Sequence, residues 1–297
     1  MFCTLPLVSI IVPCYNVSKY VKRCLDSLVN QTYSNIEIIC VDDFSTDGTY
    51  NILSQFSLND ERVKIFLNKE NKGVAFSRQV GLDNASGKYI MWCDSDDWYE
   101  LNMVEEMLRA MEENKVDLVI SNINVIDDEN LFRRKVESLV HYENLHLCGK
   151  VKLNKNIILN IPRFLWNKIF KKSIIDKYKI TFPNVKLSED CSFFLKYLAV
   201  SNLKIYILEN KLYNYMRRED SIIGKRFLDV DHIYFSDSVK AYDDMVDFID
   251  KYYFIRFKKV YKECRYWDIL SILDLIQKSS KSELESVLDI YEKKKFN

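Results

Sequence analysis

Glycine is scarce in this chain, with six residues among 297, and their spacing excludes two common phosphate-binding motifs. Neither Gly-x-Gly-x-x-Gly nor Gly-x-x-x-x-Gly-Lys followed by Ser or Thr can be formed from them. Dinucleotide oxidoreductases and P-loop enzymes are therefore disfavoured, and so is a nucleotidyltransferase with a glycine-rich loop after its first strand. The six positions are Gly48, Gly73, Gly81, Gly87, Gly149 and Gly224.

Other catalytic signatures are absent as well. The sequence has no Gly-x-Ser-x-Gly elbow, and its three histidines, His141, His146 and His232, have no metal or triad spacing. The eight cysteines include no Cys-x-x-Cys pair, which predicts buried free thiols in a reducing compartment. An aspartyl phosphatase would carry its nucleophile directly after the first strand, where Pro13 and Cys14 stand instead.

The chain also lacks net charge and long apolar runs. Its 43 basic and 43 acidic residues cancel, so no overall field attracts nucleic acid, and we expect no nucleic-acid partner. No stretch approaches the roughly 20 apolar residues that cross a bilayer. Residues 1–11 lack both a basic start and a small-residue cleavage site. We therefore expect a cytoplasmic protein.

Apolar runs alternate with amphipathic stretches through the first 125 residues. This alternation predicts an α/β fold in which an open, mainly parallel, twisted sheet carries helices on both faces. With 48% hydrophobic residues, the chain can form one large domain with an appended subdomain. The expected strands are residues 8–12, 36–41, 63–67, 89–93 and 116–121, and the expected helices start near residues 18, 49, 74 and 100.

Polar clusters follow three of these expected strands, namely Pro13 to Asn16, Asp42-Asp43 and Asp94 to Asp97. Ligands bind beyond the carboxyl ends of the strands in open parallel sheets, so the three loops should converge on one crevice. The carboxylates between Asp94 and Asp97 would repel one another unless a divalent cation sat among them. A solvated turn that begins the next helix is the alternative.

Several short segments occur in a dense order through about residue 125. They are Val8 to Asn16, Val41 to Thr49, Asn71 to Gly73, Ser77 to Leu82, Gly87 to Ile90 and Asp94 to Asp97. In this order they resemble the family 2 glycosyltransferases. The resemblance implies the GT-A nucleotide-diphospho-sugar transferase fold and inverting transfer of a sugar from a nucleotide sugar, usually a UDP-sugar. It also implies Mn²⁺ or Mg²⁺ as cofactor.

The resemblance assigns roles to the residues of the donor site. Asp96 is the expected metal ligand, and Asp94 should face the ribose or support the metal through water. Asp43 resembles the residue that reads the uracil edge, with Pro13 and Tyr15 as the wall beside the base. Arg78 could reach phosphate or nucleobase, and the alternative is an arginine on a helix surface. A cation that bridges the two phosphates would stabilise the leaving diphosphate.

The segment Lys186 to Phe194 resembles the Glu-Asp motif of the family. Inversion needs a base that removes the proton of the acceptor hydroxyl, and Asp190 is the candidate. Glu189 is the neighbour that positions the acceptor or the base. From the residues alone, Ser188-Glu189-Asp190 is better interpreted as an ordinary capped helix start, and the resemblance to the family favours the catalytic role instead.

The segment Leu212 to Ser221 follows an expected edge strand and is similar to the Tyr-x-Tyr lid of the family. Arg218 and Ser221 could close on the pyrophosphate. Met216 stands where many relatives are basic, so the assignment between Arg217 and Arg218 stays open. Trp166 could stack on the acceptor sugar, or could be an ordinary buried tryptophan.

We expect the catalytic domain at residues 1–225, with the nucleotide-sugar part at about 1–125 and the acceptor and lid part at about 126–225. Residues 226–297 should form a helical C-terminal extension. Its basic and aromatic residues between 256 and 265 could rest on an anionic membrane, near a lipid-linked acceptor, at the inner face of the cell membrane. Packing on the catalytic domain or a dimer contact is the alternative. Donor sugar, acceptor glycan or lipid, and linkage are not fixed by these motifs.

Two other functions are the alternatives to sugar transfer. One is a carbohydrate-binding or scaffolding protein that kept the fold and lost turnover, and the other is a metal-dependent phosphoryl-transfer enzyme. Asp96 and Asp190 argue against the first, and the strand end at Pro13-Cys14 argues against the second.

Overall fold

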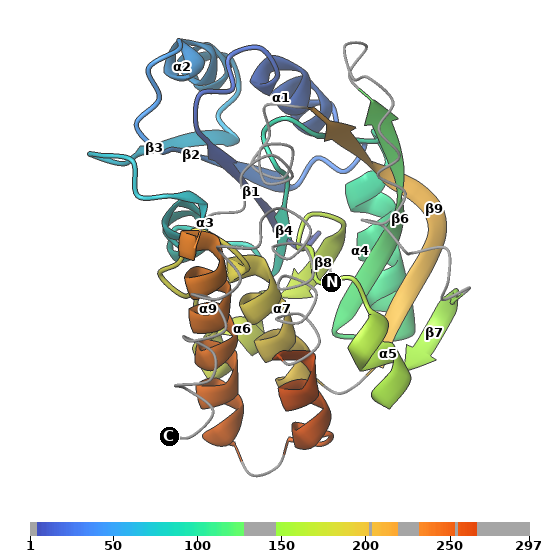
Figure 1. Cartoon of the computed structure of the whole chain (residues 1–297). Coiled ribbons are helices and arrows are strands. Elements are labelled where there is room, and N and C mark those ends of the chain that lie inside the picture. The colour runs from blue at the N-terminus through green and yellow to red at the C-terminus, as the bar shows by residue number, and fades with distance from the viewer. Residues whose placement is uncertain (1–4, 128–146, 202–203, 219–231, 253–254, 266–297) are drawn as a thin grey trace.

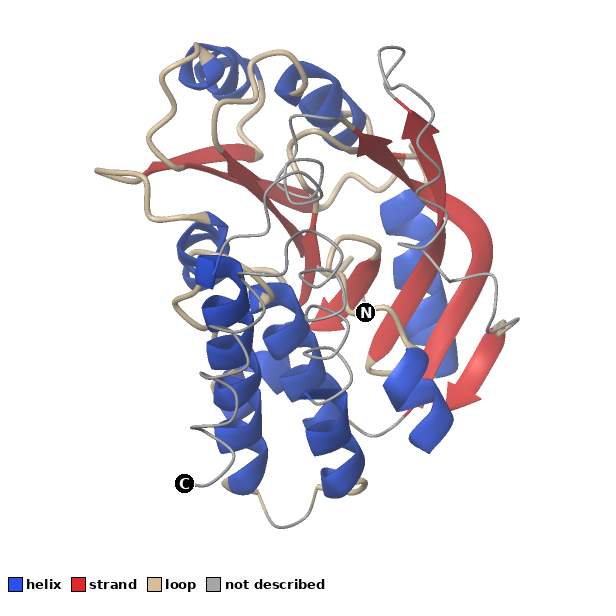
Figure 2. Ribbon diagram, in the orientation of Figure 1, coloured by secondary structure: helices blue, strands red, loops and turns tan. Residues whose placement is uncertain are grey.

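The computed structural model describes residues 5–127, 147–201, 204–218, 232–252 and 255–265. A single sheet runs through it in the strand order β3-β2-β1-β4-β8-β6-β9-β5, and β7 pairs with β9 beside that path. The expectation of a mixed α/β fold with an open, mainly parallel sheet is confirmed (Figures 1 and 2). The expected boundary between the two domains lies outside the described residues, and the division into domains stays a prediction.

The first half of the sheet is parallel. Strand β1 (Val8–Cys14) lies between β2 (Ile36–Asp42) and β4 (Tyr89–Trp92), and β3 (Val63–Leu67) pairs with β2. Strands β1, β2 and β4 are buried along their whole length, as their mainly apolar sequences predict, and the buried Glu37 of β2 is paired with Ser9 of β1 and with Lys64 of β3. All of these strands end on one edge, and the polar loops of the candidate site follow there.

The second half of the sheet mixes strand directions. Strand β8 (Lys168–Lys171) is antiparallel to both β4 and β6 (Leu118–Asp127), and β6 is parallel to β9 (Lys204–Arg217). Strands β5 (Trp98–Tyr99) and β7 (Gly149–Lys152) are antiparallel to β9. The expected edge strand before residue 212 is therefore wrong, because β9 has partners on both sides.

Helices cover both faces of the sheet (Figure 1). One face carries α1 (Val21–Val29), α2 (Thr49–Asn59) and α4 (Met103–Asn114), whose apolar residues share one core cluster with alternate residues of β1 and β2. The other face carries α3 (Val74–Asp83), α5 (Lys155–Asn160), α6 (Lys172–Tyr178), α7 (Glu189–Val200) and α9 (His232–Asp250). Met103, Met107 and Met111 of α4 follow one another at helical spacing, and all three are buried, as that spacing predicts.

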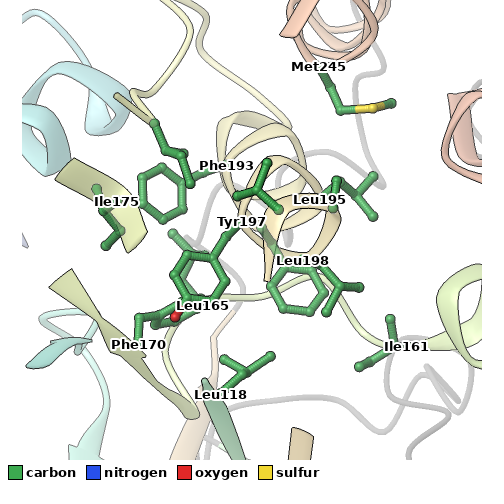
Figure 3. Close-up of a cluster of buried hydrophobic side chains, with 14 of the residues drawn as sticks. Leu118, Ile161, Leu165, Phe170, Ile175, Phe193, Leu195, Tyr197, Leu198 and Met245 are labelled. Carbon is green, nitrogen blue, oxygen red and sulfur yellow. The ribbon is translucent and has the colours of Figure 1, made fainter. Parts of the chain in front are cut away.

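The core around α7 is rich in aromatic rings. Phe193 and Tyr197 point from α7 toward Phe170 of β8 (Figure 3), and their rings meet edge to face. Trp92, at the end of β4, packs edge to face against Phe170 and Phe193 at 5.1 and 5.2 Å between ring centroids. This cluster fixes α7, and with it the Glu189-Asp190 pair, against the end of β4.

Helix α3 approaches the sheet closely because Gly81 faces β1. A Cβ on Gly81 would clash with the side chain of Ile11. The helix can therefore lie flat on the strand and bury the turn that carries Arg78. This contact turns Arg78 toward the edge of the sheet where the polar loops meet.

The described part of the C-terminal segment packs on the catalytic fold. Helix α9 lies beside α7 (Figure 1), and Val239, Met245 and Ile249 join the same core. Basic residues of the segment 256–265 are paired with acids, since Lys258 and Lys262 both contact Asp250 and Arg265 contacts Asp243. Both acids belong to α9, so the pairs lie within the segment itself. Val260, Tyr261 and Cys264 of the same stretch join the core beside α7, which favours packing on the domain, and membrane docking stays a prediction. Among the residues that the structure describes, no helix has the length and apolar character needed to span a bilayer.

Candidate functional site

The loop after β4 is fixed to β9 through Asp97. The carboxylate of Asp97 accepts a hydrogen bond from the Tyr213 hydroxyl at 2.5 Å and from the backbone N–H of Met216 at 2.7 Å. Only 1% of Asp97 is exposed, and burial, together with the charges of Asp96 and Asp94, raises the pKa of its carboxyl. Asp97 therefore anchors the loop, while the side chains of Asp94 and Asp96 stay 28% and 18% exposed.

Asp96 contacts the arginine that the lid segment places opposite it. The Nε of Arg218 lies 2.7 Å from the Oδ2 of Asp96, and its guanidinium lies 4.8 Å from the ring centroid of Tyr20. Burial raises the pKa of Asp96, while the charge of Arg218 opposes that shift. Of the two arginines that the sequence left open, Arg218 is the one that the structure places on Asp96. Its contact with a diphosphate stays a prediction, and Ser221 lies outside the described residues.

Arg78 joins the two acidic motifs. Its Nη2 donates to Asp94 at 2.8 Å, and its Nη1 donates to Glu189, 111 residues away in sequence. Only 5% of Arg78 is exposed, so the alternative of an arginine on a helix surface is wrong. Although burial works in the opposite direction, Asp94 and Glu189 raise the pKa of Arg78. A permanently charged fork thus holds the Asp94 and Glu189 carboxylates together.

Glu189 and Asp190 begin helix α7 in different environments. Burial raises the pKa of Glu189 to about 7, Arg78 opposes the shift, and Asp190 adds to it. Asp190 is only half-buried, and its Oδ1 accepts the backbone N–H of Cys191 at 2.7 Å. Ser188 does not cap the helix, since its hydroxyl contacts Ser238 and its backbone is left-handed. The second carboxylate oxygen of Asp190 is therefore the group that a substrate hydroxyl could reach.

The expected nucleobase residues lie at the ends of β1 and β2. Asp43 is buried and accepts hydrogen bonds from the Nδ2 of Asn68 and the backbone N–H groups of Lys72 and Gly73, at 2.7 to 2.9 Å. Pro13 occupies the strand end, and 48% of Tyr15 is exposed beside it. The same carboxylate thus shapes the loop before α3. Its contact with uracil stays a prediction.

The sequence reasoning missed Asn68 as a partner of Asp43. A signal for it was present, because Asn68 is the first residue after β3 and therefore lies on the same edge as the other polar loops. Tyr213 was assigned to a lid but not to Asp97. Its partner lies 116 residues away, and local pattern carries no information about that pairing.

Phe44, directly after Asp43, is strained and exposed. Its φ is 65°, a left-handed value that L side chains rarely adopt, and 54% of its surface is open. Replacing Phe44 with Gly should therefore stabilise the fold by about 1 kcal/mol, because glycine accepts this φ without a steric penalty. Urea unfolding midpoints test this prediction. The neighbour Tyr15, outside the left-handed region, provides the control, since Tyr15→Gly should lower the midpoint. Equal losses in both variants would contradict the idea of strain.

Trp166 lies inside an aromatic stack. The rings of Phe164, Tyr213 and Tyr215 all stack on the ring of Trp166. The distances between ring centroids are 5.0, 4.4 and 5.4 Å, respectively. Only 5% of Trp166 is exposed. Stacking of an acceptor sugar on Trp166 would therefore require one of these rings to move. The stack thus connects the loop before β8 with β9, the strand whose Tyr213 and Met216 bond to Asp97.

The chemistry of Asp94 and Asp96 fits a hard divalent cation. Carboxylate oxygens are the ligands that Mg²⁺ and Mn²⁺ prefer, and Mg²⁺ commonly uses one or two carboxylates together with substrate phosphates. Across the described ranges, no group of three or more His, Cys, Asp or Glu residues is gathered into a ready-made metal site. Both carboxylates are held by arginines, Asp94 by Arg78 and Asp96 by Arg218. The residues therefore fit a cation that takes its remaining ligands from a bound diphosphate.

The chain is similar to known proteins along most of its length. The model of the family Glycosyl transferase family 2 matches residues 9–179. Glycosyltransferase GlyG of Streptococcus pneumoniae serotype 4 is 34% identical over 231 residues, which are 74% of this chain and 74% of that protein. Glycosyltransferase GlyA of the same organism is 33% identical over 72% of this chain, and the match spans only 31% of its length. Cholesterol galactosyltransferase of Borreliella burgdorferi is 30% identical over 95% of this chain and 82% of that protein.

Solved structures show the same architecture. S. aureus TarS in complex with UDP-GlcNAc matches with a TM-score of 0.70 at 22% identity, covering 89% of this chain and 72% of that chain. Mannosyltransferase PcManGT from Pyrobaculum calidifontis, in complex with GDP-Man and Mn²⁺, matches with a TM-score of 0.53 at 15% identity. That match covers 98% of this chain and 81% of the mannosyltransferase. At these identities the two structures establish a shared fold.

Proposed function

Because the chain belongs to glycosyl transferase family 2 and has the fold of its GT-A members, we propose that it is a metal-dependent inverting glycosyltransferase. It takes a sugar from a nucleotide sugar, for which a UDP-sugar is the leading candidate, and gives it to a hydroxyl group. The observation that carries this proposal is the fork of Arg78, which joins Asp94 of the donor motif to Glu189 of the Glu-Asp motif.

The two motifs have complementary tasks in such a reaction. Asp190 accepts the proton of the acceptor hydroxyl while that oxygen bonds to the anomeric carbon. The bond from the anomeric carbon to the diphosphate breaks on the opposite face, and the nucleoside diphosphate leaves with the electron pair. Asp96 and Asp94 would hold the cation, which when bound neutralises charge on the leaving phosphates. Arg218 would release Asp96 and turn to the diphosphate.

The relatives support a donor and acceptor class. TarS binds UDP and UDP-GlcNAc, which supports a UDP-sugar donor, and the mannosyltransferase complex supports Mn²⁺. The cholesterol galactosyltransferase supports a lipid hydroxyl as one acceptor class. The similarity to TuaG of Bacillus subtilis, named as a teichuronic acid biosynthesis glycosyltransferase, supports a glycan acceptor in surface polysaccharide synthesis. Cys14, Cys24, Cys40 and Cys93 are buried free thiols, which suits the cytoplasmic location we propose, with membrane contact at its inner face.

A nucleotide-sugar panel tests the proposal directly. In the presence of Mn²⁺, a UDP-sugar at about a hundred times its dissociation constant should raise the melting temperature by roughly 5–10 °C, because it binds only the folded chain. The same sugar should be hydrolysed slowly to UDP and free sugar. Omission of the metal should remove most of the shift. Binding without hydrolysis or transfer to any offered hydroxyl would instead identify a carbohydrate-binding protein that kept the fold, and no shift with any nucleotide sugar would overturn the proposal.

A further inference from the structure

The turn before α7 needs support from outside the helix. Ser188, which directly precedes the first helical residue, has a φ of 63°, a left-handed value that L side chains rarely adopt. Its side chain makes no capping hydrogen bond to the backbone of α7. A residue in this conformation persists only where its surroundings hold it there. The groups that hold Ser188 therefore have to come from another part of the fold.

Helix α9, which lies beside α7 (Figure 1), supplies these groups. The hydroxyl groups of Ser188 and Ser238 share a hydrogen bond at 3.0 Å, and Ser238 is fully buried. One residue earlier in α9, the Oδ2 of Asp237 accepts the backbone N–H of Lys186 at 2.9 Å. Asp237 is also buried. Two neighbouring residues of α9 thus bond the chain immediately before Glu189, the first residue of α7.

The polar contacts between the two helices continue beyond this turn. The Oδ2 of Asp244 accepts hydrogen bonds from the Ser192 hydroxyl at 2.7 Å and from the Lys196 Nζ at 2.6 Å. Ser188, Ser192 and Lys196 follow one another at intervals of four residues, so one stripe of α7 faces α9. Rotation of α7 about its own axis would break these bonds. Helix α9 therefore fixes the orientation of α7 as well as the turn before it.

The sheet side holds the same end of α7 through Glu189 alone. The carboxylate of Glu189 is bonded to Arg78, whose second arm reaches Asp94. Asp190 has a different partner, because its Oδ1 accepts the backbone N–H of Cys191 within its own helix. The direction of the Asp190 carboxylate therefore follows the backbone of the first turn of α7. A change in the preceding turn would redirect that carboxylate.

We propose that Asp237 and Ser238 are positioning residues, which fix the turn before α7 so that the Asp190 carboxylate points toward the acceptor hydroxyl. This inference rests on the proposed glycosyltransferase function. Both residues act through the chain at Lys186 and Ser188, two to four residues before Asp190. Their loss should slow removal of the acceptor proton and leave donor binding unaltered, because the donor motifs lie on other elements.

Asp237→Ala removes the acceptor of the Lys186 N–H. Because a displacement of about 1 Å can lower a rate by about a hundredfold, kcat should fall by roughly ten- to a hundredfold. The KM for the nucleotide sugar should stay within about twofold of the wild-type value. Asp237→Asn is the rescue variant, since its amide oxygen can still accept the Lys186 N–H, although the charge that pairs with Lys240 is lost. Its kcat should remain within about threefold of wild type.

Asp243→Ala is the matched control. Asp243 is a carboxylate of the same helix, and it pairs with Arg265 at 2.7 Å, within the C-terminal segment. Both alanine variants should lose no more than about 4 °C in melting temperature, but Asp243→Ala should keep the wild-type kcat. A fall in kcat that is confined to Asp237→Ala separates positioning of Asp190 from general support of α9.

A milder variant and a measurement without turnover cover the case in which Asp237→Ala does not fold. Ser238→Ala removes a single hydroxyl group, and its kcat should fall by about three- to tenfold. Exchange of backbone amide hydrogens with deuterium reports on the turn itself. Peptides that cover residues 185–192 should exchange faster in Ser238→Ala than in Asp243→Ala, because the turn has lost a bond that holds it closed.

Three results would each overturn the inference by itself in an active wild-type enzyme. The first is a kcat in Asp237→Ala and Ser238→Ala that matches that of Asp243→Ala. The second is a kcat in Asp237→Asn as low as that in Asp237→Ala, and the third is unchanged exchange over residues 185–192 in Ser238→Ala. A wild-type chain without transfer to any offered hydroxyl would instead overturn the proposed function and this inference with it.

Discussion

Asp190→Asn is expected to lower the turnover number about a thousandfold while the dissociation constant of the nucleotide sugar stays within about twofold. The amide has the shape of the carboxylate and can still accept the backbone N–H of Cys191, so helix α7 keeps its first turn. It cannot accept the proton of the acceptor hydroxyl at neutral pH. Titration calorimetry gives the binding constant, and release of the nucleoside diphosphate gives the rate.

Asp176→Asn is the control for this substitution. Asp176 is an exposed carboxylate of α6 that pairs with Lys172, away from the polar edge of the sheet. Its amide variant should bind and turn over like the wild type. Wild-type turnover in Asp190→Asn would remove Asp190 from the role of base. Loss of donor binding would show that it acts on the nucleotide sugar instead.

Arg78→Lys is expected to lose both stability and activity. A lysine keeps the positive charge but cannot bond Glu189 and Asp94 with two parallel arms, so one buried carboxylate is left without its partner. Breaking a buried pair in this way costs about 3–5 kcal/mol, which corresponds to a drop of roughly 10 °C in melting temperature. Differential scanning calorimetry measures the drop.

The loss should depend on pH through Glu189. Its pKa in the folded protein is raised to about 7, above the usual value of a glutamate, so the folded state binds this proton more tightly than the unfolded state. Stability from this group is present at low pH and is lost as pH rises through 7. The Arg78→Lys deficit should therefore shrink between pH 7 and pH 5.

Arg62→Lys is the matched control for the fork. Arg62 makes a comparable two-armed pair with Asp60, at a partly exposed position. Ion pairs of this kind contribute about 1 kcal/mol or less, so its melting temperature should hardly change. If the melting temperature of Arg78→Lys also hardly changed, the bridge that Arg78 makes between Asp94 and Glu189 would not contribute to stability.

Much of the fold could be predicted from local sequence. The strands at residues 8, 36 and 89 are mainly apolar runs, and such runs are buried whichever topology surrounds them. The strand at residue 63 was also expected, although only its first residue is buried. The polar loops after these strands were placed on one edge because parallel strands end together. Pro13 was expected to end the first strand. Instead β1 continues to Cys14, and Pro13 pairs in register with Val41 of β2, beyond the last residue of β1 that pairs with β4.

The remainder depends on contacts that no local pattern encodes. The partners of Arg78 come from two distant motifs. The sequence of an amphipathic helix alone does not show whether its arginine faces solvent or a buried carboxylate. An edge strand was expected before residue 212, yet β5, β6 and β7 all pair with β9, and these partners come from distant parts of the chain. The charge state of Glu189 follows from depth of burial, which helix periodicity indicates only for apolar residues.

The hydrogen bonds of Asp97 have a consequence for the order in which activity arises during synthesis. Its two partners in β9 follow it by 116 and 119 residues, so a nascent chain carries the donor motifs long before the groups that fix them. Contacts of such sequence separation form late, because a long loop must close first. The growing polypeptide therefore leaves the ribosome with these loops unassembled, and the proposed sugar transfer can begin only after translation has passed β9.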